Sequence, residues 1–417
     1  MEARTYAEFS ARVHAEVNQQ RIPVNGTIEI THRCPLTCAH CYNNLPMADA
    51  GARARELTFE EHCRVIDELA DLGCLWVLYT GGEIFARRDF LDIYTHAKKR
   101  GLLVTLFTNG TLITESLADY LVKWPPFSIE ITLYGATAET YEALTGIPGS
   151  YARCMRGIEL LAERRLPLKL KTVAVSINRH EIAAMHAIAD RYGVEFKFDA
   201  MINPRIDCSS SPLAVRLTPA EVVSLDLLDE ERVVEWRRML ASFGPIDYGD
   251  EQPQVYDCGG GVNSFAIDPY GDMTICVLSK NDRYNVRDGS VYEGWQTFLR
   301  AVRDRKATRL TKCTRCALKG LCGMCPANGE LENGDPEAPV DFLCQTAHLR
   351  ARALDVEVPE HGDCEYCESG EQHELMGRMH EELRAIMGGE TFQPLPIPPR
   401  SAASCTSGGC SSCSLGR

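Results

Sequence analysis

The sequence predicts an α/β fold built on a parallel sheet. Between about Gly26 and Ala200, short β-branched and apolar runs alternate with segments of helical apolar spacing, which gives six strand–helix units in series. Such a series favours parallel strands joined by right-handed crossovers. A chain of 417 residues that is 45% hydrophobic and 24% charged is also long enough for two or three domains with a sizeable core.

The predicted strands and helices follow one another closely. The strands are expected over residues 26–31, 77–79, 102–108, 128–134, 168–175 and 194–199. The helices between them are expected over residues 57–71, 89–100, 116–123, 151–164 and 179–192. Thr58 and Glu61 have the spacing of a capping box at the start of the first of these helices. A further helix is predicted within residues 1–25, ahead of the first strand.

The rest of the chain divides into three predicted parts. Residues 201–257 form a bridging region with a helix near residues 219–240, and residues 258–350 hold most of the remaining cysteines. Residues 351–417 are first acidic and then rich in Pro, Ser, Gly and Cys. Such a composition predicts a largely irregular tail.

Three cysteines follow the first predicted strand as a CxxxCxxC motif, at Cys34, Cys38 and Cys41. On a tight loop, three thiolates hold three corners of a cubane iron–sulfur cluster and leave the fourth iron open for a small molecule, whereas four would make a closed electron-transfer centre. A zinc site completed by His32 or His40 is the alternative interpretation.

A second motif, Gly81-Gly82-Glu83, follows the second predicted strand. Glycines let a backbone approach a ligand closely, and a carboxylate suits an ammonium partner. Together with CxxxCxxC, this motif resembles the radical S-adenosylmethionine (radical SAM) superfamily. The resemblance implies a partial (β/α)6 TIM-like barrel over residues 26–200 and a [4Fe–4S] cluster whose open iron binds SAM. One electron then cleaves SAM to methionine and a 5′-deoxyadenosyl radical, which abstracts hydrogen from a substrate.

The resemblance also implies contacts to SAM. The glycine-rich motif would bind the SAM amino group, and His40 would contact the adenine region. Lys171 on the fifth strand is a candidate for the SAM carboxylate, and Asn109 or Thr132 for a hydroxyl group. Tyr134 stands where many members have Asp and is a candidate hydrogen donor to a substrate radical. A purely structural role is the alternative for each of these residues.

A second set of cysteines lies further along the chain, at Cys258, Cys276, Cys313, Cys316, Cys322, Cys325 and Cys344. Their order resembles the SPASM domain, a C-terminal extension of one radical SAM subfamily, except that two residues instead of three separate Cys322 from Cys325. A zinc ribbon built on Cys313, Cys316, Cys322 and Cys325 is the alternative.

The SPASM resemblance implies two auxiliary [4Fe–4S] clusters. Cys313, Cys316, Cys322 and Cys344 would hold the distal cluster, and Cys258, Cys276 and Cys325 the proximal one. Residues 248–257 contain no cysteine to complete the proximal set. We therefore expect an open or exchangeable fourth site there, with Cys208 or a tail cysteine as the rival ligand.

The tail carries two further cysteine patterns. His361, Cys364, Cys367 and His373 have the spacing of a zinc site, with an unligated acidic linker as the alternative. The last three cysteines lie in a Ser- and Gly-rich segment that resembles a small cysteine-bearing core peptide. They are Cys405, Cys410 and Cys413. A substrate mimic, a cluster-delivery arm and disorder remain alternatives.

Charge and cysteine content restrict the partners and the compartment. Lys and Arg total 44 against 58 Asp and Glu, and the net charge of −14 disfavours nucleic acid and anionic membranes. The N-terminus lacks a signal-peptide pattern, and no apolar run approaches the ~20 residues of a membrane span. Nineteen cysteines in such a chain predict metal binding in a reducing cytoplasm.

These observations predict a radical SAM/SPASM enzyme that modifies a peptide or protein. Thioether or carbon–carbon crosslinking, epimerisation and oxidative decarboxylation of a ribosomal peptide are the expected reactions. An enzyme acting on a small molecule, such as a haem-type tetrapyrrole decarboxylase, and a non-catalytic iron–sulfur scaffold or electron carrier are the alternatives. The expected partners are an electron donor such as a flavodoxin or ferredoxin and a separate leader-recognition protein, because the segment before the first strand is short.

Overall fold

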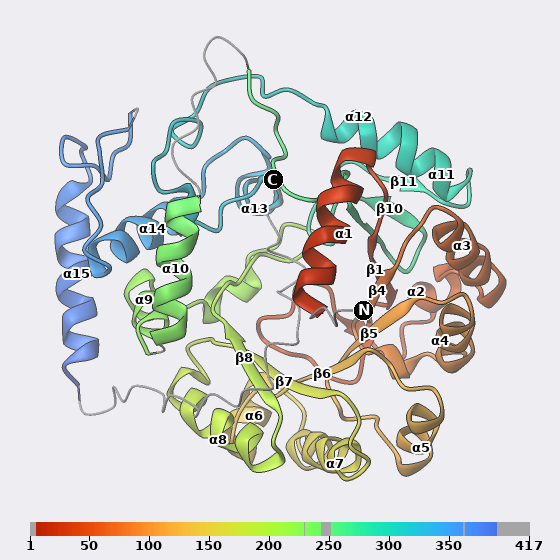
Figure 1. Ribbon diagram of the computed structural model, residues 1–417. Helices are drawn as coiled ribbons and strands as arrows, with labels where there is room; N and C mark the ends of the chain where they lie inside the picture. The colour runs from red at the N-terminus through yellow and green to blue at the C-terminus, as the bar shows by residue number, and fades with distance from the viewer. Residues whose placement is uncertain (1–5, 229, 243–251, 362, 390–417) are drawn as a thin grey trace.

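A single curved sheet organises the molecule. The computed structural model describes residues 6–228, 230–242, 252–361 and 363–389. Within the sheet, six parallel strands stand in the order in which they occur along the chain (Figure 1). They are β1 (Asn25–Thr31), β4 (Trp76–Gly81), β5 (Leu103–Thr108), β6 (Ser128–Thr132), β7 (Leu168–Val173) and β8 (Glu195–Asp199). Since β8 does not pair with β1, the barrel is open, as the partial (β/α)6 prediction required.

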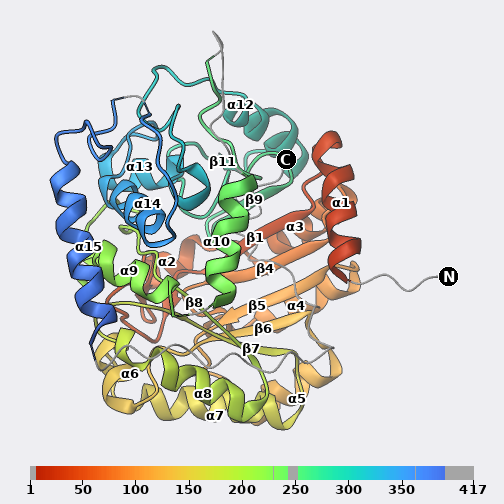
Figure 2. The ribbon, with the colours of Figure 1, turned by 60° about the vertical axis from the view of Figure 1, so that its left-hand side comes forward.

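Helices cover the outer face of the barrel (Figures 1 and 2). They are α3 (Phe59–Asp71), α4 (Phe90–Lys99), α5 (Glu115–Lys123), α6 (Ala138–Thr145), α7 (Ser150–Glu163) and α8 (Ile182–Tyr192). The capping box at the start of α3 is confirmed. The Glu61 amide donates to Thr58 Oγ1 at 3.2 Å, and the Thr58 amide donates to Glu61 Oε2 at 2.7 Å.

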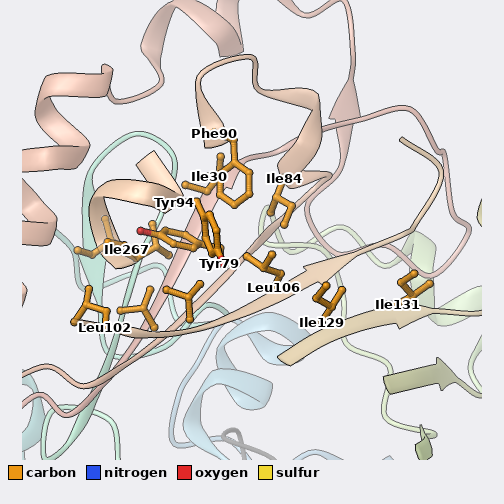
Figure 3. Packing of buried hydrophobic residues seen from close by; sticks show 14 of the residues in the cluster. Ile30, Tyr79, Ile84, Phe90, Tyr94, Leu102, Leu106, Ile129, Ile131 and Ile267 are labelled. Carbon is orange, nitrogen blue, oxygen red and sulfur yellow. The ribbon is translucent and has the colours of Figure 1, made fainter. Parts of the chain in front are cut away.

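The main hydrophobic core lies between the sheet and these helices (Figure 3). Tyr79 of β4 meets Phe90 of α4 edge to face, with ring centroids 5.4 Å apart. Ile129 and Ile131 of β6 point toward the same core. Because side chains alternate along a strand, Glu130 between them projects to the inner side of the barrel, away from the helices.

The second half of the chain extends the same sheet. Strand β9 (Ser264–Ile267) pairs in parallel with β1, and β10 (Asp272–Thr274) and β11 (Tyr284–Asn285) follow in antiparallel order. Strand β1 is therefore an inner strand with neighbours from both halves of the chain. The domain boundaries drawn from the sequence stay predictions, but the backbone hydrogen bonding runs across them.

Of the remaining helices, α2 lies between β1 and β4, and the others lie before or after the barrel strands. These helices are α1 (Tyr6–Gln20), α2 (Ala50–Arg55), α9 (Pro219–Asp226), α10 (Glu230–Ser242), α11 (Val291–Glu293), α12 (Arg300–Arg303), α13 (Pro326–Asn333), α14 (Asp341–Ala353) and α15 (His373–Met387). The helix predicted near residues 219–240 is thus two helices. No helix in the described part of the chain is long and apolar enough to cross a membrane.

The tail differs from its prediction in one respect. Residues 373–387 form α15 instead of an irregular segment, and α15 packs on α9, where Leu383 meets Ala220 and Val223. The three last cysteines of the sequence lie outside the described residues.

Candidate metal and cofactor site

The CxxxCxxC motif lies in the loop that follows β1. A short parallel pair, β2 (Arg33–Cys34) and β3 (Leu45–Pro46), closes this loop. The Thr37 amide donates to the Thr145 carbonyl at 2.9 Å, which fixes the loop to the end of α6. Because β1 runs parallel to its neighbours, the loop lies at the carboxyl edge of the sheet, where barrel folds collect their ligands.

The structure brings the three motif cysteines together. Burial raises the pKa of all three thiols, and that of Cys34 to about 12. The thiol of Cys38 is close enough to Cys34 and Cys41 for their charges to raise its pKa further. The Asn109 side-chain amide donates to Cys34 Sγ at 3.5 Å. Three neighbouring thiols on one loop fit an iron–sulfur cluster, and binding iron would release their protons.

The two glycines at the end of β4 sit directly against the cysteine loop. The Gly82 amide donates to the Thr31 carbonyl at 2.7 Å. A Cβ atom on Gly82 would lie 2.5 Å from the His32 carbonyl oxygen and 2.6 Å from that of Arg33. Gly81 has φ +125°, which side chains rarely adopt, and a Cβ there would clash with the Thr31 carbonyl. In the structure, the glycines therefore bring two strand ends of the protein together.

Glu83 is fully buried and links β4 to β5. Its carboxylate accepts hydrogen bonds from Thr108 Oγ1 at 2.8 and 2.9 Å, the Asn109 amide at 2.9 Å and the Phe85 amide at 3.2 Å. Burial raises the pKa of Glu83 to about 6, although these hydrogen bonds oppose the shift. Its role toward an ammonium group of SAM stays a prediction.

Glu29 is a buried carboxylate that the sequence analysis did not identify. It accepts hydrogen bonds from the side chains of Asn43 at 2.6 Å, Tyr42 at 3.0 Å and Lys280 at 3.4 Å, and His32 Nε2 lies 3.3 Å away. Burial alone would raise the pKa of Glu29, but the charges of Lys280 and His32 and the hydrogen bonds lower it to about 2. Glu29 therefore joins β1, the cysteine loop and the second half of the chain.

The other predicted contacts lie on the same side of the barrel. Tyr134 packs against His40 with ring centroids 5.1 Å apart, and it hydrogen-bonds with Thr132. Burial lowers the pKa of His40 to about 4. His40 Nδ1 is buried without a hydrogen-bond partner in the described structure. Lys171 Nζ lies 3.3 Å from Glu130 Oε2 on the inner side of the barrel.

The second set of cysteines falls into two groups. Cys313 and Cys344 are in direct contact, and the hydrogen bond with Cys344 lowers the pKa of Cys313 to about 7. Cys322 interacts electrostatically with Cys313 and Cys316. Cys258, Cys276 and Cys325 make the other group, in which the charges of Cys325 and Cys258 raise the pKa of Cys276 and that of Cys258 raises the pKa of Cys325. The grouping matches the two ligand sets that the SPASM resemblance implies, and the role of these cysteines as ligands stays a proposal.

Glu330 of α13 holds the proximal group in place. Its carboxylate accepts hydrogen bonds from the amides of Lys280 and Asn281, both at 2.9 Å, and from Ser279 Oγ at 3.0 Å. Cys208, the rival fourth ligand, is exposed at φ +64°, and its Sγ lies 3.9 Å from the Glu330 carbonyl oxygen.

Comparisons with known proteins agree with this fold. Residues 28–188 match the Radical SAM superfamily. The PqqA peptide cyclase of Granulibacter bethesdensis is 32% identical over 171 residues, which are 41% of this chain and 45% of the relative. The AdoMet-dependent heme synthase of Methanosarcina barkeri is 33% identical over 165 residues, which are 40% of this chain and 46% of the relative. The chain thus spans slightly less than half the length of these two curated relatives.

The fold similarity extends beyond the matched region. The crystal structure of Streptococcus suis SuiB bound to precursor peptide SuiA superimposes with a TM-score of 0.60 at 18% identity, covering 81% of this chain and 80% of that one. An open parallel barrel whose first strand leads into a CxxxCxxC loop is the architecture of a radical SAM domain. The matched segment, residues 28–188, is therefore a radical SAM domain.

Proposed function

We propose that this protein is a radical SAM/SPASM enzyme that cleaves SAM reductively and abstracts hydrogen from a peptide or protein substrate. One observation carries the proposal. Three mutually close thiols, of which Cys34 is buried, lie at the carboxyl end of β1, where Asn109 and the Gly81-Gly82 backbone bring the ends of β5 and β4 against them. The matched family and the peptide-cyclase relative support the reaction class.

In the proposed site, Cys34, Cys38 and Cys41 hold a [4Fe–4S] cluster. The bound cluster and SAM supply a one-electron cleavage that yields a 5′-deoxyadenosyl radical. Asn109 donates to Cys34 Sγ, and hydrogen bonds to cluster sulfurs are one of the means by which proteins set cluster potentials.

The protein's side chains next to the loop are proposed to bind SAM and substrate. Gly81-Gly82-Glu83 would take the amino group, His40 the adenine region and Lys171 the carboxylate. Asn109 already bonds Cys34 and Thr111, so Thr132 is the more accessible candidate for a hydroxyl. Tyr134, next to Cys38, is proposed as the hydrogen donor to a substrate radical.

The second set of cysteines is proposed to bind two auxiliary [4Fe–4S] clusters. Cys313, Cys316, Cys322 and Cys344 would hold the distal cluster, and Cys258, Cys276 and Cys325 the proximal one with an open fourth site. These clusters would accept an electron from the product radical or position the substrate. A flavodoxin or ferredoxin as electron donor, a separate leader-recognition protein and a reducing cytoplasm remain predictions from the sequence.

Cleavage of SAM tests the central proposal. Anaerobically reconstituted protein, reduced in the presence of SAM, should release 5′-deoxyadenosine. Cys38→Ala should lose iron and reduce this product at least ~100-fold, because a missing cluster ligand abolishes the one-electron chemistry. Cys63→Ala, on α3 and outside both cysteine sets, should behave like the wild type. Absence of 5′-deoxyadenosine from iron-loaded wild type would favour an iron–sulfur scaffold or electron carrier.

The heme synthase relative supports a second candidate, an enzyme acting on a tetrapyrrole side chain. Mass spectrometry separates the two substrates. Co-expression with short candidate peptides should yield a modified peptide. A crosslink or a decarboxylation would change its mass, whereas an epimerisation would change only its retention time. Conversion of a porphyrin carboxylate, with every candidate peptide unchanged, would favour the second candidate.

A further inference from the structure

A compact cluster of two histidines and two cysteines lies away from the proposed cleavage site. It consists of His348 on α14 and of His361, Cys364 and Cys367 in the connection between α14 and α15. All four side chains are buried, with 5–6% of each exposed. One potential ligand atom from each residue lies within 4.8 Å of the other three. We propose that these four residues bind one structural Zn²⁺ ion.

The spacing of the ligand atoms suits a single tetrahedral ion. Zinc bonds of ~2.0–2.1 Å to nitrogen and ~2.3 Å to sulfur give tetrahedral edges of about 3.3–3.8 Å. His348 Nε2 lies 3.5 Å from Cys364 Sγ and 3.9 Å from Cys367 Sγ. Cys367 Sγ lies 3.5 and 3.9 Å from the two ring nitrogens of His361. The distances between these ligand atoms are therefore close to those around a tetrahedral zinc ion.

Both histidines are oriented as metal ligands. His348 Nδ1 lies 2.9 Å from the Cys344 carbonyl oxygen, and His361 Nδ1 lies 2.9 Å from the Pro359 carbonyl oxygen. An Nδ1–H group that donates to a backbone carbonyl leaves the lone pair of Nε2 for the metal. Two thiolates and two neutral imidazoles also balance the charge of Zn²⁺, so the buried site would be neutral.

The surroundings give the ion a structural task. Between the end of α14 and the start of α15, the described residues contain no helix or strand. Apart from the two cysteines, the small hydrophobic cluster at this site has Tyr366 and Met376 of α15 as its buried members, and Leu354 of the connection is buried in a neighbouring cluster. A segment with so little apolar surface is commonly stabilised by a structural metal. The zinc would hold the connection against α14, whose Cys344 belongs to the distal cysteine set.

The structure corrects the zinc site suggested by the sequence spacing. His373, at the start of α15, is not part of the cluster. Its Nε2 lies 3.3 Å from Nη2 of Arg352 on α14. His348 takes its place from α14, although it precedes His361 by 13 positions. Cys316 Sγ also lies 3.4 Å from His361 Nε2, but Cys316 falls outside the group of four and adjoins Cys322 of the distal set.

Metal analysis of the purified full chain tests the assignment. Wild type reconstituted with iron and sulfide should contain about one zinc per chain, as expected for a Cys2His2 site. Cys364→Ala and His348→Ala should each lose most of this zinc and keep their iron. His373→Ala is the matched control and should keep the zinc. Replacement of zinc by Co²⁺ should give the absorption bands of a tetrahedral site with thiolate ligands.

Three results would overturn the assignment. The first is a wild-type protein that contains no stoichiometric zinc. The second is that His373→Ala loses zinc while His348→Ala keeps it. The third is that Cys316→Ala loses zinc but retains its iron. Should the ligand variants fail to fold, a chelator can be applied to the wild type. Removal of one zinc should lower the unfolding temperature and expose the connection to protease, and an unchanged melting curve would contradict the proposal. Because zinc is counted directly, these results do not depend on SAM cleavage.

Discussion

Gly82 shows how one missing side chain positions the cysteine loop. The sequence predicted that glycines at this point let the backbone approach a ligand closely, and that role stays a prediction. The group that approaches is the protein's own backbone, because the His32 and Arg33 carbonyls occupy the space that a Cβ would fill. A short glycine motif indicates that another group lies close to the backbone, but it does not reveal whether that group is a ligand or another part of the protein.

Gly82→Ala should displace the end of β4 from the loop. Overpacking of this kind costs about 1–3 kcal/mol, and here the strain falls next to Cys34. We expect a lower unfolding temperature and reduced iron content after reconstitution. Gly377→Ala on α15, where a Cβ would meet nothing within 4 Å, is the control and should be neutral or slightly stabilising. Equal iron content in both variants would show that the contact does not position the loop.

At the scale of helices, Asp226 joins three of them. This carboxylate at the end of α9 bonds Arg232 of α10 at 2.8 Å and Arg350 of α14 at 2.7 and 2.9 Å. Burial would raise the pKa of Asp226, but the charges of Arg350 and Arg232 outweigh it and lower the pKa below its ordinary value. The ion pairs therefore stabilise the native state at neutral pH.

Asp226→Asn should lower the free energy of unfolding by about 3–5 kcal/mol, because Arg350 would be left buried without its counter-charge. The lowered native pKa also predicts a pH dependence. The contribution of Asp226 is complete above the unfolded pKa of ~3.9 and is lost as the pH falls through the lower native pKa. Denaturant unfolding between about pH 5 and pH 2 should therefore show a shallower acid slope in this variant. The exposed Asp288→Asn variant should retain the wild-type slope.

Local patterns predicted most of the barrel but not the tail helix. The α3 capping box and the alternating strands are signals contained in a few neighbouring residues. In α15, Met376, Met379 and Leu383 have helical spacing, yet the acidic composition of the surrounding segment favoured an irregular tail. The α9 partners of Met379 and Leu383 lie more than 150 positions earlier, so the packing that stabilises the helix could not be predicted from the local sequence.

For the whole molecule, Glu330 and Glu29 connect the two halves. Glu330 fixes the loop after Cys276, and Lys280 of that loop reaches Glu29 beside the first cysteine motif. Residues 29 and 280 are 251 positions apart, and neither belongs to a recognisable motif. The sequence therefore predicted both cysteine sets but not the contacts that join them.

Glu330→Ala should leave the buried Ser279 hydroxyl and the amides of Lys280 and Asn281 without their acceptor, and the buried hydroxyl alone should cost about 1–3 kcal/mol. We expect the proximal group to lose its cluster, which is about four iron atoms per chain. Iron and sulfide counting measures this loss, while uncoupled release of 5′-deoxyadenosine should persist. Glu332→Ala, which removes only the ion pair with Arg216, is the control. Unaltered iron in Glu330→Ala would contradict this prediction.

The pairing of β9 with β1 has a consequence for how the chain matures. Strand β1 is made early in synthesis, but its second neighbour emerges only after more than 200 further residues. Until then its open backbone groups are a template for pairing with other chains. The barrel of this protein is thus not a self-contained unit, and a version cut near residue 200 would be prone to aggregate through its first strand.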